Sequence, residues 1–429
     1  MTEKTLLIGQ TLRFQGDPFQ DGLDAAIHDA RGGILIEAGH IAEVGSADDL
    51  RRTYPDAAIT DYGDALLFPG FIDAHAHYPQ TAIIASWGKR LIDWLNTYTF
   101  PEELRFGDPD YAAEAARQYF DLTLSHGTTT VATYCTIHPA SVDAFFGEAA
   151  RRGVCAIAGK TCMDRNAPDG LCDTAQTAYD DSKALLEKWH GKRRLIYAVT
   201  PRFSPTSTPE QLHALGALWA EHPDCPMQTH LSEQTDEVAW VKELFPAARD
   251  YLDTYETAGL VGPGALFGHA IYLTDREKAR IADSGSALVH CPTSNTFIGS
   301  GLFDLDGRKS AGQTVGLATD TGGGSSFSML RTMAAAYEVA QLRGRALHPS
   351  ELLWLATEGS ARALRIADRV GALRPGLAAD LIVVDLASTP AIAQRSARAD
   401  TIWEAVFPTI MMGDDRAIKE VLILGEPIA

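Results

Sequence analysis

The sequence is poor in cysteine and has no long apolar run. Its six cysteines, at positions 135, 155, 162, 172, 225 and 291, form no CxxC pair, which argues against a disulfide framework or a cysteine-rich metal site. A membrane-spanning helix needs about 18 or more apolar residues in succession, and the chain has no such run. Residues 1–16 carry no basic segment followed by an apolar stretch. We therefore predict a cytoplasmic protein that does not enter the membrane.

Basic residues are also scarce. The chain has 37 lysines and arginines against 56 aspartates and glutamates, which gives a formal charge of -19, and it has no run of basic residues. A protein that binds nucleic acid needs a basic surface to neutralise the phosphates. This balance argues against nucleic acid as a partner and favours a small, neutral substrate.

Eight short apolar runs are present, and segments with helical spacing lie between them. The runs cover residues 65–77, 128–135, 154–162, 195–203, 227–233, 265–273, 286–295 and 314–323. The helical candidates include residues 110–127, 209–222 and 275–285. Eight alternations of strand and helix predict an α/β fold, a (β/α)8 barrel of the TIM type.

Two of the predicted helices carry a start signal. Thr208 is followed by Gln211, and Thr274 is followed by Glu277. Each pair fits a capping box, in which the two side chains satisfy backbone amides that the first turn leaves free.

The two chain ends differ from this middle region. Residues 1–65 and 371–429 consist of short apolar segments and turns, without the alternation seen between them. Strand-rich ends on either side of a barrel can pair with each other. We predict that residues 66–370 form the catalytic barrel, and that residues 1–65 and 371–429 together form a small β-sandwich domain.

Histidines lie at the ends of two predicted strands. His75 and His77 are two positions apart, so on an extended strand both rings face the same side. His230 ends the fifth strand and Asp320 ends the eighth. The active sites of such barrels lie at the carboxyl ends of the strands. Three imidazoles and a carboxylate suit zinc, and they also accept iron or manganese. Hydrogen-bonded core histidines are the alternative, but two rings aimed at one point favour a metal site.

Further polar residues at these strand ends could take part in catalysis. Glu233 lies three positions after His230 and could shuttle protons, although the helix dipole also favours an acid at a helix N-terminus. His269 ends the sixth strand, where it could orient water, stabilise an oxyanion or simply cap a loop. Asp320 could accept a proton from the attacking water. The occurrence of these residues at separate strand ends favours catalytic roles.

Several familiar zinc motifs are missing. The sequence has no HExxH, which argues against a zinc protease, and no HxE with PCxxC, which excludes the zinc fold of the cytidine-type deaminases. The other histidines, His290 among them, and the glycines after Asp320 show no spacing that indicates chemistry. We expect these residues to be structural.

Taken together, the motifs resemble the amidohydrolase superfamily over essentially the whole chain. "PGFIDAHAH", the three later strand-end residues and "GALRPGLAADLIVVD" carry this resemblance. The fourth strand ends in "TPRF", without the lysine that bridges two metal ions in many members, and HxxE after the fifth strand marks the deaminases with one metal. The long first loop, "TPRFSPTS", "HCPTSN" and "GSGLF" are similar to the members that deaminate guanine.

The resemblance implies roles for individual residues and a cofactor. It implies one zinc ion per subunit held by His75, His77, His230 and Asp320, with Glu233, His269 and Asp320 as catalytic residues. The substrate contacts that we expect are Gln80, Arg202, Phe203, His230 and His269, with Trp87 packed on the ring. The resemblance also suggests a homodimer.

The expected reaction is the hydrolysis of guanine to xanthine and ammonia. Arginine offers donors alone, which match the acceptors O6 and N7 of guanine, whereas adenine presents an amino donor at position 6. The prolines on either side of Arg202 should hold it in one orientation. Two alternatives stay open: a one-metal deaminase that acts on another aminopurine, a pterin or a triazine, and a metal-free binding protein on the same barrel.

Overall fold

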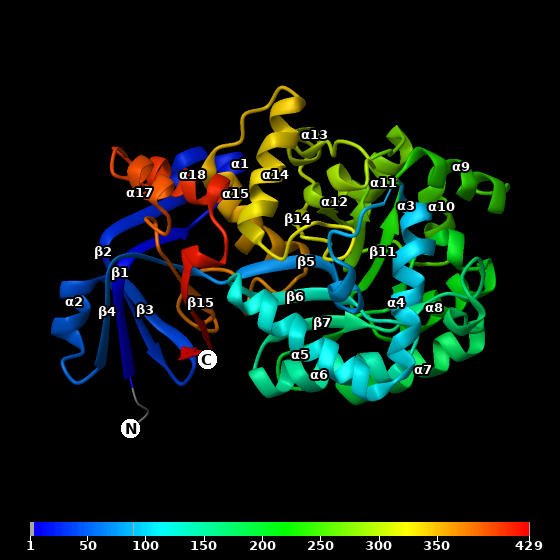
Figure 1. The fold of residues 1–429 in the computed structure, drawn as a ribbon, viewed down its shortest axis with the longest axis horizontal. Coiled ribbons are helices and arrows are strands. Elements are labelled where there is room, and N and C mark those ends of the chain that lie inside the picture. The colour runs from blue at the N-terminus through cyan, green and yellow to red at the C-terminus, as the bar shows by residue number, and fades with distance from the viewer. Residues whose placement is uncertain (1–3, 89, 429) are drawn as a thin grey trace. The chain divides into compact units, whose positions relative to one another are not determined.

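The computed structural model describes residues 4–88 and 90–428, which form two compact units (Figure 1). One unit contains residues 4–73, 122–130 and 328–428, and the other contains residues 74–121 and 131–327. The domain bounds at residues 65 and 370 stay a prediction.

Seven strands from both chain ends form one sheet in the first unit. Their order is β17-β16-β15-β4-β1-β2-β3. The strands are β1 (Lys4–Phe14), β2 (Ala26–Glu37), β3 (His40–Ser46), β4 (Ala58–Pro69), β15 (Leu381–Val384), β16 (Ile418–Ile423) and β17 (Glu426–Pro427). Strand β4 pairs in parallel with β1 and antiparallel with β15. The pairing of β4 with β15 therefore joins the two ends of the chain, as predicted. Their strands form one seven-stranded sheet, not the two packed sheets of a β-sandwich.

Apolar side chains on these strands point alternately to the two sides of the sheet, so both faces are apolar. Leu7, Ile34 and Leu381 belong to one buried cluster, while Leu6 and Leu35 belong to another. Neighbouring residues of a strand point to opposite faces, so both faces must be covered. This is why short segments with continuous apolar sequence occur at both ends of the chain.

The first unit also contains helices. They are α1 (Pro18–Asp21), α2 (Ala47–Thr53), α14 (Met329–Leu342), α15 (Pro349–Trp354), α16 (Ser360–Ala363), α17 (Pro390–Ser396) and α18 (Ile402–Met412). The prediction that residues 371–429 contain strands and turns alone is wrong, because α17 and α18 lie there. Thr389 and Thr401 start these two helices by accepting hydrogen bonds from backbone amides of the first turn.

Eight parallel strands form the predicted barrel in two four-stranded sheets, with the orders β5-β6-β7-β9 and β11-β12-β13-β14. The strands are β5 (Phe71–His77), β6 (Thr128–Tyr134), β7 (Cys155–Gly159), β9 (Leu195–Tyr197), β11 (Met227–Leu231), β12 (Ala265–His269), β13 (Ala287–His290) and β14 (Val315–Leu317). Two short strands, β8 (Thr161–Cys162) and β10 (Thr200–Pro201), pair with each other beyond β7 and β9. All eight strands fall within the predicted apolar runs.

Backbone hydrogen bonds join the two sheets into a closed barrel. The N–H of Gln228 donates to the carbonyl of Val199 over 3.0 Å. On the other side, the N–H of Asp320 donates to the carbonyl of His75 over 2.9 Å, and the N–H of His77 donates to the carbonyl of Thr321 over 3.1 Å. A closed barrel leaves no free sheet edge. The predicted (β/α)8 fold is confirmed.

Helices follow the barrel strands in the chain. The longer ones are α5 (Pro109–Ser125), α6 (Pro139–Arg152), α7 (Ala175–Trp189), α8 (Pro209–Glu221), α9 (Thr235–Leu244) and α11 (Asp275–Ser284). Shorter ones are α3 (Leu91–Trp94), α4 (Phe100–Glu103), α10 (Tyr251–Glu256), α12 (Pro292–Phe297) and α13 (Leu305–Ser310). Figure 1 shows α5, α6 and α7 along one side of β5, β6 and β7.

The two predicted capping boxes differ. At α11 the box is complete, because Thr274 and Glu277 each bind the backbone amide of the other. At α8 the Thr208 side chain accepts from the Gln211 amide, but the Gln211 side chain contacts Ser207 and Asp173 instead. The amide of Thr208 donates to Asp164, 2.7 Å away. A tertiary contact therefore replaces the second half of the box.

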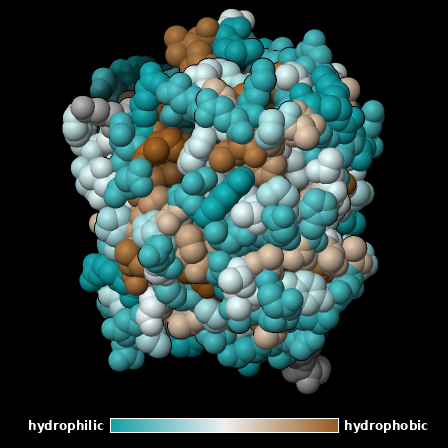
Figure 2. Space-filling model, turned by 90° about the vertical axis from the view of Figure 1, so that its right-hand side faces the viewer, coloured by the Kyte–Doolittle hydropathy of each residue, from teal (hydrophilic) through white to brown (hydrophobic). Residues whose placement is uncertain are grey.

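The surface drawn in Figure 2 is mostly hydrophilic, with hydrophobic side chains in separate spots. Among the described residues, no helix combines the length and the apolar character needed to cross a bilayer. All six cysteines are free thiols, as their spacing predicts.

A substitution at Gly159 would test how closely β7 and the segment after β9 approach each other. A Cβ atom at this position would lie 1.8 Å from the carbonyl oxygen of Ala198, which is backbone and cannot turn away. We expect Gly159→Ala to lower the free energy of unfolding by about 2 kcal/mol or more, through forced separation of β7 and β9. Thermal unfolding followed by circular dichroism would measure the change.

Gly147 provides the control, since it lies in α6 and a Cβ there would meet no atom within 4 Å. Gly147→Ala should leave the melting temperature unchanged or raise it, because alanine favours a helix over glycine by about 1 kcal/mol. Equal melting of the two variants would contradict the close strand contact.

Candidate active site

Five ionisable side chains meet at the carboxyl ends of the barrel strands. His75 and His77 belong to β5, His230 to β11 and His269 to β12, and Asp320 follows β14. All five are buried. Parallel strands of a closed barrel end at the same rim, so residues far apart in the sequence come together there.

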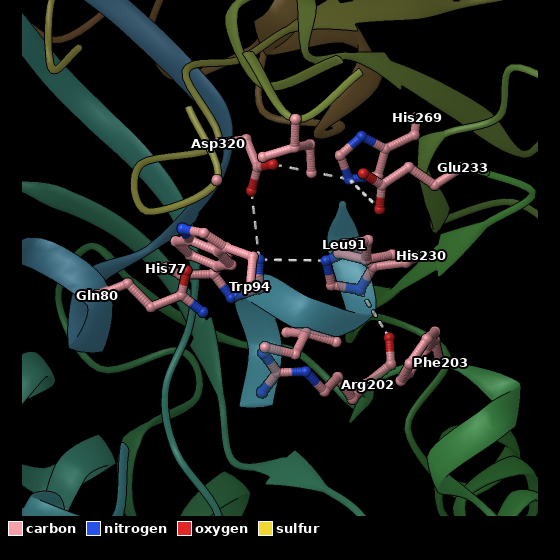
Figure 3. Close-up of a pocket in the computed structure, with 13 residues that line it drawn as sticks. His77, Gln80, Leu91, Trp94, Arg202, Phe203, His230, Glu233, His269 and Asp320 are labelled. Carbon is pink, nitrogen blue, oxygen red and sulfur yellow. Dashed lines mark hydrogen bonds and ion pairs between the residues drawn. The ribbon is translucent and has the colours of Figure 1, made fainter. Parts of the chain in front are cut away.

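The atoms that could bind a metal ion lie close to one another (Figure 3). Asp320 Oδ1 is 3.4 Å from His75 Nε2 and 3.3 Å from His77 Nε2. His77 Nε2 is 3.1 Å from His230 Nε2. Ligand atoms of His75, His77 and Asp320 lie within 4.8 Å of one another, and so do those of His75, His230 and His269. Donor atoms this close are compatible with metal bonds of about 2 Å.

The protonation of these residues also suits a metal ion. His230 Nδ1 lies 2.7 Å from the carbonyl oxygen of Arg202. A carbonyl oxygen accepts, so Nδ1 carries the hydrogen and Nε2 of the neutral ring offers its lone pair. Burial, and then the neighbouring histidines, hold the pKa of His230 well below its usual range, and burial lowers the pKa of His77 to about 4. Neutral imidazole is the form that binds metals.

Asp320 completes the set as a carboxylate. Burial alone would raise its pKa, but hydrogen bonds with His75 and His77 outweigh burial and hold the pKa well below the usual range. Three imidazoles and one carboxylate form a donor set that fits a divalent ion such as zinc.

Glu233 lies beside this centre and is held by Ser300. Its Oε1 accepts a hydrogen bond of 2.7 Å from Ser300 Oγ, and its Oε2 lies 3.6 Å from His269 Nε2. Burial, and then the charge of Asp320, raise the pKa of Glu233 to about 8. A carboxyl group with this pKa holds a proton at neutral pH and can deliver it inside the pocket.

Four residues at these strand ends have a left-handed backbone. The φ angle is 49° at Ser232, 64° at His269, 46° at Ala270 and 50° at Asp320. This conformation costs a non-glycine residue about 1 kcal/mol or more, so the surrounding structure must hold it. One such contact joins His269 Nδ1 to Asn295 Oδ1 over 2.8 Å. Strained residues of this kind cluster at functional sites.

A pocket opens beside the centre. It is lined by His77, Gln80, Leu91, Trp94, Leu95, Arg202, Phe203, His230, Glu233, His269, Ile298, Asp320 and Gly323. Figure 3 shows Asp320, His269 and Glu233 at the top of the view and Arg202 at the bottom. The arrangement combines groups suited to hydrolysis with groups suited to binding a flat, polar ring.

The loop that carries Arg202 and Phe203 is braced by a neighbouring loop. Arg165 Nη2 donates to the carbonyl of Ser204 over 2.9 Å, and Asn166 Nδ2 donates to the carbonyl of Pro205 over 2.7 Å. The prolines limit the backbone of this loop, and these contacts fix its position.

Gly322 makes room for Gln80. A Cβ at Gly322 would lie 2.0 Å from Gln80 Oε1, and the φ angle of +116° disfavours any other residue. The first of the glycines after Asp320 therefore has a packing role next to the pocket.

Trp87 lies outside this pocket, contrary to the prediction. Its side chain is 74% exposed, and Trp94 lines the pocket in its place. Leu91 and Trp94 are the first and last residues of α3, and at this helical spacing both side chains face the pocket. The spacing of tryptophans in the first loop gives no signal to choose between them.

Several residues around the site have no signal of their own in the sequence. Ser300 and Asn295 belong to the motifs "GSGLF" and "HCPTSN", but the motifs do not say which residue they contact. Tyr134 packs its ring 4.6 Å from the ring of His77. Glu103 is buried behind Arg202 and Gln80, and nothing distinguishes it from its neighbour Glu102 in the sequence. His290 is buried against Phe303 and does not line the pocket.

Comparison with known proteins gives consistent matches. The model of the amidohydrolase family matches residues 66–428. A guanine deaminase of Escherichia coli strain K12 is 42% identical over 419 residues, which is 97% of this chain and 92% of that protein. The solved structure of an E. coli guanine deaminase matches with a TM-score of 0.97 at 39% identity, covering 99% of both chains. A guanine deaminase from C. acetobutylicum with guanine bound in its active site matches with a TM-score of 0.91 at 29% identity, covering 100% of both chains.

Metal content tests the donor set. We expect the purified protein to contain one divalent ion per chain, and His230→Ala to lose at least about tenfold in affinity, because three ligands replace four. Metal analysis by mass spectrometry after dialysis against a weak chelator would measure this.

His290→Ala is the matched control, because it removes a buried histidine at a neighbouring strand end outside the cluster. It should keep the metal. Equal retention by His230→Ala would show that the ion is bound elsewhere.

Proposed function

This chain belongs to the amidohydrolase family, and from that premise we propose that its barrel site deaminates guanine by hydrolysis to xanthine and ammonia. The chain is an enzyme of the deaminase type within this family. Its similarity to guanine deaminases extends over nearly its full length, and its pocket carries the groups that this reaction requires.

One observation carries the choice of substrate. Arg202 is buried at the pocket, where its donors have little access to water. Guanine presents the acceptors O6 and N7 to an arginine, whereas adenine presents an amino donor at position 6. A buried donor that meets a donor stays unpaired, and such a mismatch can reduce turnover by a factor of about 10⁴. Phe203 lies next to Arg202 and can pack on the ring.

Two carboxyl groups divide the proton transfers. Water attacks C2 of the ring, and Asp320, as a carboxylate, accepts a proton from it. Glu233 holds a proton at neutral pH and gives it to the ring nitrogen beside C2. It then takes the second proton of the water from the new C2 hydroxyl group and delivers that proton to the amine, which leaves as ammonia. The proton held by Asp320 finally restores the protonated form of Glu233. His269 lies within 4 Å of both carboxyl groups and stabilises charge on the oxygen that becomes the new carbonyl.

The ion in this proposal is zinc, held by His75, His77, His230 and Asp320, with iron or manganese as alternatives. A divalent ion held by these residues supplies Lewis acidity, which lowers the pKa of water towards about 7. The chain residues then bind the purine, orient it and move the protons. The donor set supports this choice because it combines imidazole nitrogens with one carboxylate oxygen.

We further propose that residues 66–370 act as the catalytic barrel of a cytoplasmic homodimer. The resemblance to the guanine-deaminating members of the family supports the dimer. The acidic composition and the free cysteines support the location.

A direct assay tests the function. Purified, metal-loaded protein incubated with guanine should release xanthine and ammonia in equal amounts, measured by ultraviolet absorbance and by an ammonia-coupled assay. Adenine should give no ammonia, because its edge mismatches Arg202. Turnover of a pterin or triazine without turnover of guanine would point to another deaminase of the same family.

Arg202→Ala tests the substrate contact. Loss of the buried donors should reduce kcat/KM for guanine by about a hundredfold or more, while metal content stays at the wild-type level. Arg151→Ala is the control, because Arg151 forms an exposed ion pair with Glu148 on α6. Full activity of Arg202→Ala would refute the assignment of guanine through this residue.

A further inference from the structure

Glu103 contacts both polar side chains that reach the pocket. Its Oε1 and Oε2 lie 3.0 and 2.7 Å from Arg202 Nη1, and Oε1 also accepts a hydrogen bond of 3.0 Å from Gln80 Nε2. The Glu103 side chain is 1% exposed and does not line the pocket itself. A buried carboxylate thus lies behind the two residues that recognise the ring.

One helical turn places this carboxylate. Phe100 and Glu103 are the first and last residues of α4, and residues three apart lie on the same side of a helix. The Phe100 ring centre is 5.6 Å from the guanidinium carbon of Arg202. The turn therefore presents a ring and a carboxylate to the same arginine, which limits how the guanidinium can rotate.

The hydrogen bonds to Glu103 determine what Gln80 and Arg202 can still offer a ligand. A carboxylate accepts hydrogen bonds and has none to donate. The NH2 group of Gln80 must therefore face Glu103, and its Oε1 faces the other way, beside Gly322. Both contacts of Arg202 with Glu103 use Nη1, so the guanidinium still has Nε and Nη2 for other acceptors.

We propose that Glu103 is a positioning residue that sets the hydrogen-bond polarity of the substrate pocket. Glu103 binds the NH2 group of Gln80, so Gln80 presents an acceptor to the pocket, beside the donors that an arginine always carries at Arg202. The complementary ligand edge carries a carbonyl oxygen and an N–H, as a lactam does. This inference rests on the proposed deamination and specifies the substrate class as neutral 2-amino heterocycles with a lactam edge.

Charge supports the same class of ligand. Arg202 and Glu103 form a buried pair of opposite charges, so their combined charge is zero. A charge left alone in such a place would be costly, and a lone arginine would favour anions. The paired arginine instead distinguishes ligands by whether they offer acceptors to its N–H donors, and an uncharged ring can meet this requirement.

Three purines with the same reacting amine test the proposal. Guanine, 2,6-diaminopurine and 2-aminopurine all carry the amine at C2, but guanine alone has the lactam edge. In Glu103→Gln the new amide can donate to Gln80, so Gln80 can turn over and present its NH2 group. We expect the ratio of kcat/KM for guanine over that for 2,6-diaminopurine to fall about tenfold or more, mainly through KM.

Glu102→Gln is the matched control. Glu102 is buried on the same turn, but it contacts Arg105 and Tyr111 instead. This variant should keep the wild-type ratio within about twofold, as substitutions away from the relevant contacts do. Metal content and circular dichroism would be measured for every variant.

A second variant covers the case in which Glu103→Gln does not fold. Glu103→Asp keeps an acceptor group but withdraws it by one methylene, so guanine should remain the preferred substrate while its KM rises about fivefold or more.

Three outcomes would overturn the proposal. The first is folded Glu103→Gln with the wild-type ratio of kcat/KM for guanine over 2,6-diaminopurine. The second is an equal loss of kcat on all three purines in that variant. The third is an unchanged KM for guanine in Glu103→Asp. Wild-type protein that releases no ammonia from guanine would instead refute the proposed function.

Discussion

The backbone contact that closes the barrel also assembles the candidate metal site. Asp320 donates its N–H to the carbonyl of His75, and His77 donates its N–H to the carbonyl of Thr321. The same residues provide three of the ligand atoms. A shift of one residue between these two segments would move the Asp320 side chain away from His75 and His77. The register at this contact therefore determines whether the three ligand atoms meet.

Burial then gives the ionisable groups different protonation states. His77 and His230 stay neutral, Asp320 stays charged, and Glu233 keeps its proton. Two carboxyl groups in one pocket thus have pKa values on opposite sides of neutrality, which is how a single site can both accept and donate protons. Burial raises the pKa of both groups, but hydrogen bonds with His75 and His77 lower that of Asp320, whereas the charge of Asp320 raises that of Glu233 further.

The sequence predicts the parts of this site that follow from regular geometry. The eight apolar runs give the barrel, and polar residues at strand ends give the histidines, Asp320 and Glu233. Contacts that depend on how loops fold were not predictable in this way. Trp87 and Trp94 look alike in the first loop, and so do Glu102 and Glu103, because side-chain direction there depends on short turns. The missed helix α18 contains Pro408, a residue type that normally interrupts a helix, and the missed helix α17 has only seven residues.

The close contact between Gly322 and Gln80 makes substitutions at these two positions depend on each other. Any larger residue at 322 collides with the amide oxygen of Gln80, so position 322 is constrained as long as glutamine stays at position 80. Replacing Gln80 with a shorter side chain would relieve the collision, though the positive φ would still disfavour most residues. Drift towards a new substrate would therefore follow an order, with position 80 changing first and position 322 afterwards.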